Sequence, residues 1–176
     1  MKVNSIQEIL DRYSSSGKKR IVLVGNAASG KDYARKVLKT LGYQYQISYT
    51  TRPARSNEKQ AEDYFFTSEE TFKMLIRNNF FYEFVIFNGW YYGTSNAQMN
   101  RRDCVFIMTP KGLAHMGKQD RDDSLVVYFD ISEDVIKQRI SQRSDADTVE
   151  RRLAADKIDF EGFNNYDLTI DNPNFE

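Results

Sequence analysis

The sequence has few of the residues that build extracellular or metal-rich proteins. Its 176 residues include one cysteine, one histidine and three prolines, and its basic and acidic side chains balance at 25 each. A single cysteine excludes a disulfide within the chain, and a single histidine excludes a metal site shared between histidines. The balanced charge provides no overall field to hold a nucleic acid or a membrane, so any anion site must be local.

Long apolar runs are also absent. No segment approaches the roughly 18 apolar residues of a membrane-spanning helix. The start of the chain lacks the apolar stretch and small-residue cleavage site of a secretory signal, so we expect the mature protein to begin near Met1. These absences predict a cytoplasmic protein. Its length favours one compact domain with a real core, because domains most often span about 100–150 residues.

Segments that predict strands alternate with segments that predict helices. The strand segments are continuous apolar or β-branched runs, as expected of parallel strands buried on both faces. We expect strands at 20–24, 43–49, 104–108, 125–129 and 167–170, and helices at 31–41, 111–117, 133–142 and 148–160. This alternation predicts a three-layer α/β fold with a parallel core sheet.

Two segments lie outside this alternation. Residues 5–14 form an amphipathic pattern behind the N-cap candidate Ser5, which predicts an extra helix that covers part of the core surface. Residues 51–94 contain a polar loop, a helix that starts at Ser68 and two short aromatic strands. We interpret this stretch as a small mixed β/α subdomain inserted into a core of residues 18–50 and 95–176.

A glycine-rich loop follows the first core strand. Residues 25–31 read Gly-Asn-Ala-Ala-Ser-Gly-Lys and match the pattern G-x-x-x-x-G-K between a predicted strand and a predicted helix. In such a loop the backbone N–H groups and the helix N-terminus surround phosphates, and the lysine adds its charge to the β- and γ-oxygens. The pattern predicts a nucleoside triphosphate site and transfer of its γ-phosphoryl group. The expected binding residues are Gly25, Asn26, Ala27, Ala28, Ser29, Gly30 and Lys31.

The next residue, Asp32, departs from this pattern. A serine or threonine usually stands there and ligates Mg²⁺ through its hydroxyl. A carboxylate can also place an oxygen near a hard cation, directly or through water, but it adds negative charge beside the phosphates. Asp32 is therefore a candidate Mg²⁺ ligand that is not equivalent to a hydroxyl.

A second set of polar motifs lies downstream. It comprises Ser48-Tyr49-Thr50-Thr51-Arg52-Pro53-Ala54-Arg55, Glu58, Asp63-Tyr64, Glu83 and Trp90-Tyr91-Tyr92-Gly93-Thr94-Ser95. In this order the motifs resemble the guanylate kinase family of P-loop nucleoside monophosphate kinases over about residues 20–172. The resemblance implies MgATP-dependent phosphorylation of a nucleoside monophosphate, most simply GMP or dGMP. It also implies an acceptor site formed by Ser48, Arg52, Arg55, Glu58, Tyr64, Glu83, Tyr92 and Thr94.

The chemistry of these side chains agrees with the implied roles. Arg52 and Arg55 can clamp a monophosphate through charge-assisted hydrogen bonds, and tyrosine hydroxyls can add donors without adding charge. A carboxylate at Glu83 can accept bonds from the N1–H and the exocyclic amine of guanine, which adenine does not offer. We therefore expect Glu83 to recognise the base.

The resemblance also implies a short mobile lid at residues 143–152. It places Arg139, Arg143 and Arg152 on or beside this lid, with Arg143 as the principal catalytic arginine. Closure of these charges over the triphosphate would exclude water and stabilise the transferred group. Asn172 matches a family position near the donor adenine, although a role in a turn or cap fits it equally well.

The chain also departs from the family pattern. Family members usually carry two aspartates in the strand that matches Cys104–Thr109, and here Ile107 and Thr109 stand in their places. We therefore hypothesise that the negative charge of these two aspartates has moved to Asp32 in this chain.

Two alternative functions stay open: a kinase for a modified deoxynucleotide or for ribose 1,5-bisphosphate, and a non-catalytic module that binds phosphorylated peptides. Lys31 and the lid arginines argue against the peptide-binding module, because such a module would have no use for them. Small-molecule nucleotides are the expected partners, and the sequence indicates no oligomeric state.

Overall fold

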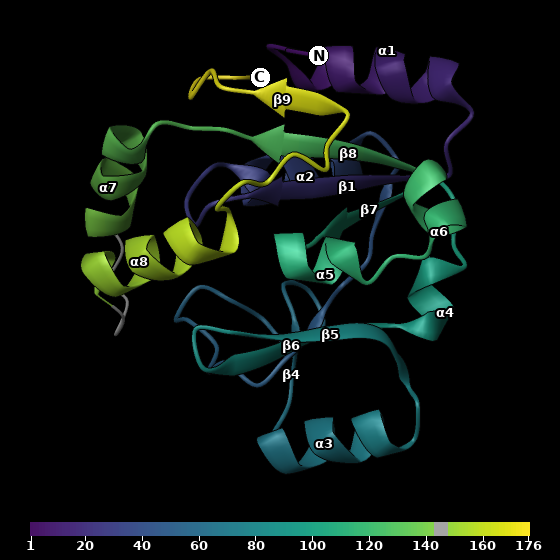
Figure 1. Cartoon of the computed structure of the whole chain (residues 1–176), viewed down its shortest axis with the longest axis vertical. Helices are drawn as coiled ribbons and strands as arrows, with labels where there is room; N and C mark the ends of the chain where they lie inside the picture. The colour runs from purple at the N-terminus through teal and green to yellow at the C-terminus, as the bar shows by residue number, and fades with distance from the viewer. Residues whose placement is uncertain (143–147) are drawn as a thin grey trace. The chain divides into compact units, whose positions relative to one another are not determined.

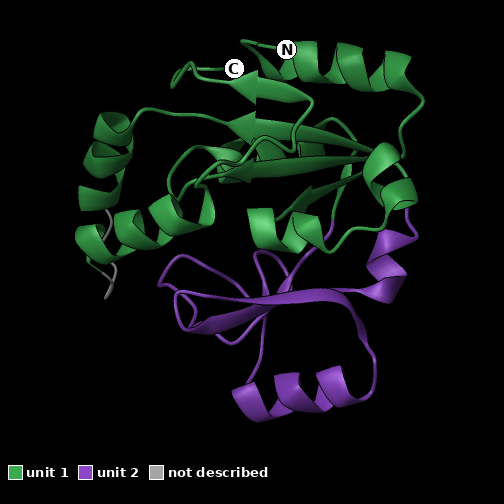
Figure 2. Ribbon diagram, viewed as in Figure 1, with its two compact units in different colours: residues 1–45, 102–176 green, residues 46–101 purple. Residues whose placement is uncertain are grey.

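The computed structural model describes residues 1–142 and 148–176. The chain forms two compact units, which are coloured separately in Figure 2: unit 1 contains residues 1–45 and 102–176, and unit 2 contains residues 46–101. Within the described ranges, no helix has the length and apolar character needed to cross a membrane.

Unit 1 is built on a five-stranded sheet with the strand order β2-β7-β1-β8-β9, in which all neighbours are parallel. The strands are β1 (Arg20–Gly25), β2 (Gln44–Tyr45), β7 (Cys104–Ile107), β8 (Ser124–Phe129) and β9 (Leu168–Ile170). Every residue of the central strand β1 is buried. The predicted parallel core sheet is confirmed, and the loop after β1 begins at the middle of its carboxyl edge.

Helices lie on both sides of this sheet. They are α1 (Ile6–Ser16), α2 (Lys31–Thr40), α5 (Pro110–Ala114), α6 (Lys118–Asp122), α7 (Glu133–Ser141) and α8 (Val149–Asp159). Figure 1 shows α2 behind the sheet and α5 in front of it, as the predicted three-layer fold requires. The helix expected at 111–117 is shorter, because His115 caps α5 and Gly117 adopts an extended conformation before α6.

The N-terminal helix α1 packs on the core of unit 1. Its N-cap Ser5 accepts a hydrogen bond from the Glu8 amide at 3.2 Å. Its apolar face buries Ile6, Ile9 and Tyr13 in the same cluster as residues of β1 and β8. The Tyr13 hydroxyl donates to Asp103 at 3.0 Å, and burial together with this carboxylate raises the pKa of the tyrosine. Packing, this hydrogen bond and a bond of 2.7 Å from the Ile6 amide to the Glu176 carbonyl oxygen thus hold α1 in place.

Unit 2 is a mixed four-stranded sheet with the order β4-β3-β6-β5. Its elements are β3 (Tyr49–Thr50), β4 (Phe65–Phe66), α3 (Glu69–Arg77), β5 (Phe81–Phe87), β6 (Trp90–Ser95) and α4 (Asn96–Met99). Asn88 and Gly89 connect β5 to β6 with positive φ angles of 52° and 84°. Two consecutive positive φ angles are typical of the tight hairpin turn that Asn-Gly favours.

The single strand expected at 43–49 is instead two short strands. Gln44–Tyr45 joins the sheet of unit 1, and Tyr49–Thr50 joins the sheet of unit 2. The alternating pattern identifies extended backbone, but it does not tell which sheet each part joins. The prediction of one strand was therefore wrong about its continuity.

Aromatic rings fill one face of the β5–β6 hairpin. Phe72 of α3 is fully buried and stacks on Phe81 with ring centroids 4.3 Å apart. A Cβ on Gly93 would lie 2.8 Å from the Phe81 ring and 3.0 Å from Phe72. Only glycine permits this close approach. The opposite face of the hairpin is therefore the one available to polar side chains.

Candidate functional site

The phosphate loop predicted at residues 25–31 connects β1 to α2. Gly30 has a φ of 104° and precedes Lys31, the first residue of α2. A Cβ on Gly30 would lie 2.9 Å from the ring of Phe175. Glycine is thus required by both conformation and space. The loop ends at a helix N-terminus, where backbone N–H groups and the helix dipole favour anions.

The ammonium group of Lys31 points back into the loop. Its Nζ donates to the carbonyl oxygens of Gly25 at 2.6 Å and Asn26 at 2.7 Å, and lies 3.3 Å from the Ser29 hydroxyl. These contacts hold a positive charge inside the curve of the loop, as the sequence pattern predicts for a phosphate site.

A carboxylate that the sequence analysis did not identify also contacts the loop. Asp156 of α8 is 3% exposed, and its Oδ2 accepts a hydrogen bond from the Ala27 amide at 2.7 Å. Burial raises the pKa of Asp156 above its ordinary value, although the Ala27 amide and the charge of Lys31 oppose this shift. Ala27 and Asp156 are 129 positions apart, so no local pattern connects them.

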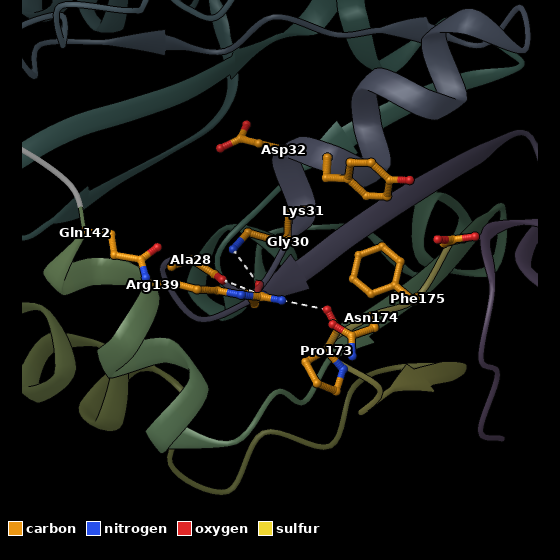
Figure 3. Close-up of a pocket in the computed structure, with 12 residues that line it drawn as sticks. Ala28, Gly30, Lys31, Asp32, Arg139, Gln142, Pro173, Asn174 and Phe175 are labelled. Atoms are coloured by element: carbon orange, nitrogen blue, oxygen red, sulfur yellow. Dashed lines mark hydrogen bonds between the residues drawn. The ribbon is translucent and has the colours of Figure 1, made fainter.

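A cavity of about 670 Å³ lies beside the loop (Figure 3). Its lining residues are Ala28, Ser29, Gly30, Lys31, Asp32, Tyr33, Arg139, Gln142, Pro173, Asn174, Phe175 and Glu176. Arg139 donates to the carbonyl oxygens of Ala28 at 3.0 Å and Pro173 at 2.6 Å. These two bonds, drawn as dashed lines, fix its guanidinium between the loop and the C-terminal segment.

The C-terminal segment contributes residues that the sequence analysis did not select. Pro173, Asn174 and Phe175 line the cavity, whereas Asn172 is not among its described lining residues. The Asn172 Oδ1 accepts from the Asn174 amide at 3.0 Å, which is a local side-chain turn. The structure thus shows the turn contact, which was one of the two roles open for Asn172.

Asp32 lines the cavity, but its carboxylate is engaged elsewhere. Its Oδ1 accepts from the Nε of Arg35 at 2.9 Å, and its side chain is 64% exposed. Figure 3 shows this carboxylate directed away from Lys31 and Arg139. The described residues contain no group of three histidine, cysteine or acidic side chains placed to hold a metal. The loop therefore offers one exposed carboxylate, which suits a cation that keeps most of its ligands as water and phosphate.

The predicted lid arginines are only partly described. Arg143 lies outside the described residues. Arg152 lies on α8, one helical turn before Asp156, and is 8% exposed. Its charge favours the ionised form of Asp156. Arg152 therefore belongs to a buried charged group next to the phosphate loop.

In unit 2, the strand register brings the predicted base-recognising residues to one face. Glu83 lies opposite Thr94, and Tyr92 lies opposite Val85 on one side and Thr50 on the other. Directly opposed residues of antiparallel strands share a face. Ser48 lies just before β3 and is 9% exposed. Glu83, Tyr92 and Thr94 are thus gathered on the face that does not carry the aromatic core.

The burial pattern of β5 is the reverse of that of a strand that buries its apolar side chains and exposes its polar ones. Glu83 is 6% exposed, whereas Phe84 and Ile86 are 37% and 55% exposed. A register shift between Phe81 and Glu83, with Tyr82 as the extra residue, places Glu83 on the face opposite to Phe81. The face that buries the Glu83 carboxylate also carries the polar side chains of Thr94 and Tyr92, and it is therefore suited to a polar ligand.

The two predicted phosphate-clamping arginines share one carboxylate. The Nη2 of Arg52 donates to both oxygens of Glu58, at 2.8 and 2.9 Å. The Nη1 of Arg55 donates to Glu58 at 3.1 Å, and the Arg55 amide donates at 2.8 Å. Burial acts to lower the pKa of Arg52, but the bond to Glu58 and the nearby charges raise it above its ordinary value. Glu58 thus orients both guanidinium groups.

Two tyrosines complete this group. The Arg52 guanidinium lies over the Tyr64 ring at 5.3 Å, and the Tyr64 and Tyr92 rings are 6.1 Å apart. Burial raises the pKa of Tyr92 although the charge of Arg52 opposes it. The Tyr92 hydroxyl therefore keeps its proton and stays a donor. Unit 2 brings together the residues predicted for the acceptor, and unit 1 brings together the phosphate loop, Asp32 and Arg139.

Comparisons with known proteins agree with this geometry. The family model described as guanylate kinase matches residues 17–176. The chain is 31% identical over 171 residues to the guanylate kinase of Legionella pneumophila (strain Paris), with 92% of this chain and 81% of the relative covered. It is also 31% identical over 169 residues to the guanylate kinase of Sus scrofa, with 89% and 85% covered.

A solved structure shows the same fold. The crystal structure of guanylate kinase from Anaplasma phagocytophilum matches with a TM-score of 0.67 and 21% identity, over 89% of this chain and 78% of that chain. The family match and the relatives each extend over most of the chain, and so the chain belongs to the guanylate kinase family.

Proposed function

We propose that this protein transfers the γ-phosphoryl group of ATP to GMP or dGMP. The observation that carries the proposal is the polar face of unit 2. It presents a buried carboxylate at Glu83, and the same unit holds two arginines oriented by Glu58. A guanine base and a monophosphate need these two kinds of partner. A base-free sugar phosphate would use the arginines but not Glu83.

The donor end of the reaction belongs to unit 1. The loop amides and Lys31 hold the triphosphate, and Arg139 adds a fixed positive charge at the edge of the cavity. Phosphoryl transfer requires little covalent chemistry from the protein, because positioning and electrostatic stabilisation supply most of the rate. Arg143 and Arg152 are the further cations proposed for the transferred group.

Mg²⁺ is the proposed metal, with Asp32 as its protein ligand. Asp32 lines the same cavity as Lys31 and its side chain is 64% exposed, so its carboxylate, which here bonds to Arg35, would reach the ion by turning toward the phosphates. When bound, the ion would neutralise charge on the phosphate oxygens.

The acceptor end belongs to unit 2. Arg52 and Arg55 would bind the monophosphate with charge-assisted bonds, helped by the hydroxyls of Tyr64 and Tyr92. Glu83 would accept bonds from the guanine N–H groups, and Ser48 and Thr94 would complete the contacts with the base. Glu58 serves this site through the two arginines.

The proposal is tested by a coupled assay of ADP release with MgATP and one acceptor at a time. The acceptors are GMP, dGMP, AMP, UMP, dTMP and ribose 1,5-bisphosphate. We expect turnover with GMP and dGMP and little with the others. Preferred turnover of ribose 1,5-bisphosphate would replace GMP as the acceptor. No turnover with any acceptor, together with tight binding of a phosphopeptide, would overturn the assignment as an enzyme.

A further inference from the structure

The contact between Asp156 and the phosphate loop is unexplained by the proposed reaction. The loop binds anions through its backbone amides, and Asp156 is itself an anion that bonds to one of them at 2.7 Å. The residue is 3% exposed, so water screens its charge poorly. The Asp156 carboxylate therefore accepts a hydrogen bond from the loop as a phosphate oxygen would.

The neighbouring charges are arranged around this carboxylate. Lys31 and Arg152 favour its ionised form, and Asp159 disfavours it. Asp159 lies almost one turn further along α8, where it forms a salt bridge of 3.2 Å with Lys111. Of these two buried aspartates on one helix, only Asp156 contacts an amide of the phosphate loop in the described residues.

We propose that Asp156 is an internal anion that competes with the donor triphosphate for the phosphate loop. A phosphate oxygen cannot take the Ala27 N–H while Asp156 holds it. Even a triphosphate that leaves this bond intact must accept a buried negative charge close to its own. Competition for the amide and repulsion between the charges both weaken donor binding, and removal of the charge of Asp156 relieves both.

Lys31 makes the competition stronger. Its ammonium group donates to the Gly25 and Asn26 carbonyl oxygens, so the loop satisfies its cation with its own acceptors. A bound triphosphate must draw Lys31 from these carbonyls while Asp156 continues to attract it electrostatically. The internal contacts therefore set how tightly the loop holds a polyphosphate.

The test measures polyphosphate binding in the full chain by isothermal titration calorimetry, with ADP and inorganic triphosphate as probes and no acceptor present. Asp156→Asn keeps the shape and an oxygen for the Ala27 amide but removes the charge. We expect this variant to lower the Kd of both probes roughly 10-fold, which is about 1.4 kcal/mol. The KM for ATP should fall in parallel, while the KM for GMP stays unchanged.

Asp159→Asn is the matched control, because it removes a buried charge from the same helix without touching the loop. Its Kd values should stay within about twofold of those of the unmodified protein. Asp156→Ala decides the outcome if Asp156→Asn does not fold. Unchanged or higher Kd values in the folded Asp156 variant would overturn the proposal. Failure of both Asp156 variants to fold would also overturn it, since Asp156 would then be a structural residue.

This inference rests on the proposed function only in assigning the triphosphate to the loop. Binding of inorganic triphosphate to the unmodified protein tests that assignment separately. If the unmodified protein does not bind the probe, the proposed donor site is wrong. If it binds and the Asp156 variants bind no better, only the competition is wrong.

Discussion

Replacement of Glu83 by glutamine removes one negative charge from the acceptor face while keeping the shape of the side chain. Glu83 is 6% exposed and lies opposite Thr94, so its charge is screened little by water. The proposed base presents two N–H donors to this carboxylate. Glutamine offers one acceptor oxygen and turns a donor NH₂ group toward the second N–H.

The magnitude follows from the loss of a charged hydrogen bond. Such bonds contribute about 1.5–3 kcal/mol, and each 1.36 kcal/mol is tenfold in a rate or binding constant. We therefore expect Glu83→Gln to lower kcat/KM for GMP roughly 10- to 150-fold. Activity with AMP should not fall, because adenine has no N1–H to lose.

The assay is coupled ADP release with GMP varied at saturating MgATP. Glu62→Gln is the matched control, since Glu62 belongs to the same unit but its side chain is 61% exposed and lies 3.6 Å from Lys59. A surface pair of this kind contributes at most about 1 kcal/mol to stability and has no part in the proposed site. The reasoning is refuted if Glu83→Gln melts like the unmodified protein and keeps its GMP kcat/KM within about twofold.

Three further predictions concern other parts of the molecule. Gly93→Ala should reduce the free energy of unfolding in urea by about 1–3 kcal/mol, because the new methyl group would overlap two phenylalanine rings; Gly117→Ala, which meets no atom within 4 Å, should cost clearly less. Asp32→Ser should raise the Mg²⁺ concentration needed for half-maximal turnover roughly 10-fold. An unchanged Mg²⁺ titration curve would show that Asp32 has not taken over the charge of the missing strand aspartates. Burial and the nearby Asp130 raise the pKa of Tyr128 to about 12. The folded protein thus keeps this proton to higher pH than the unfolded chain, and stability should fall as the pH rises from 10 to about 12; Tyr128→Phe should show a smaller fall in urea denaturation across that range.

The sequence predicted the parts of the protein that depend on local pattern. The phosphate loop at residues 25–31 could be found because its function needs backbone amides, glycines and one lysine in a fixed order. The parallel core sheet could be found because strands buried on both faces are continuous apolar runs. Family resemblance added the acceptor residues, which the structure gathers in unit 2.

Other features depend on contacts between distant segments. The segment 43–49 shows one alternating pattern, yet its two ends join different sheets. Regular alternation from Phe81 would also place Glu83 on the aromatic face. The extra residue at Tyr82 places Glu83 on the polar face instead, and no residue pattern in β5 indicates this register shift.

The phosphate loop shows both kinds of information in one place. Its sequence by itself determined that a polyphosphate is the expected ligand, because the spacing of glycines and lysine encodes the shape of the amide-lined turn. Only the tertiary structure decided what else reaches that turn. Asp156 contacts Ala27 across 129 positions because α8 packs beside the loop, and such a contact is specified by the packing of the whole unit and not by either segment alone.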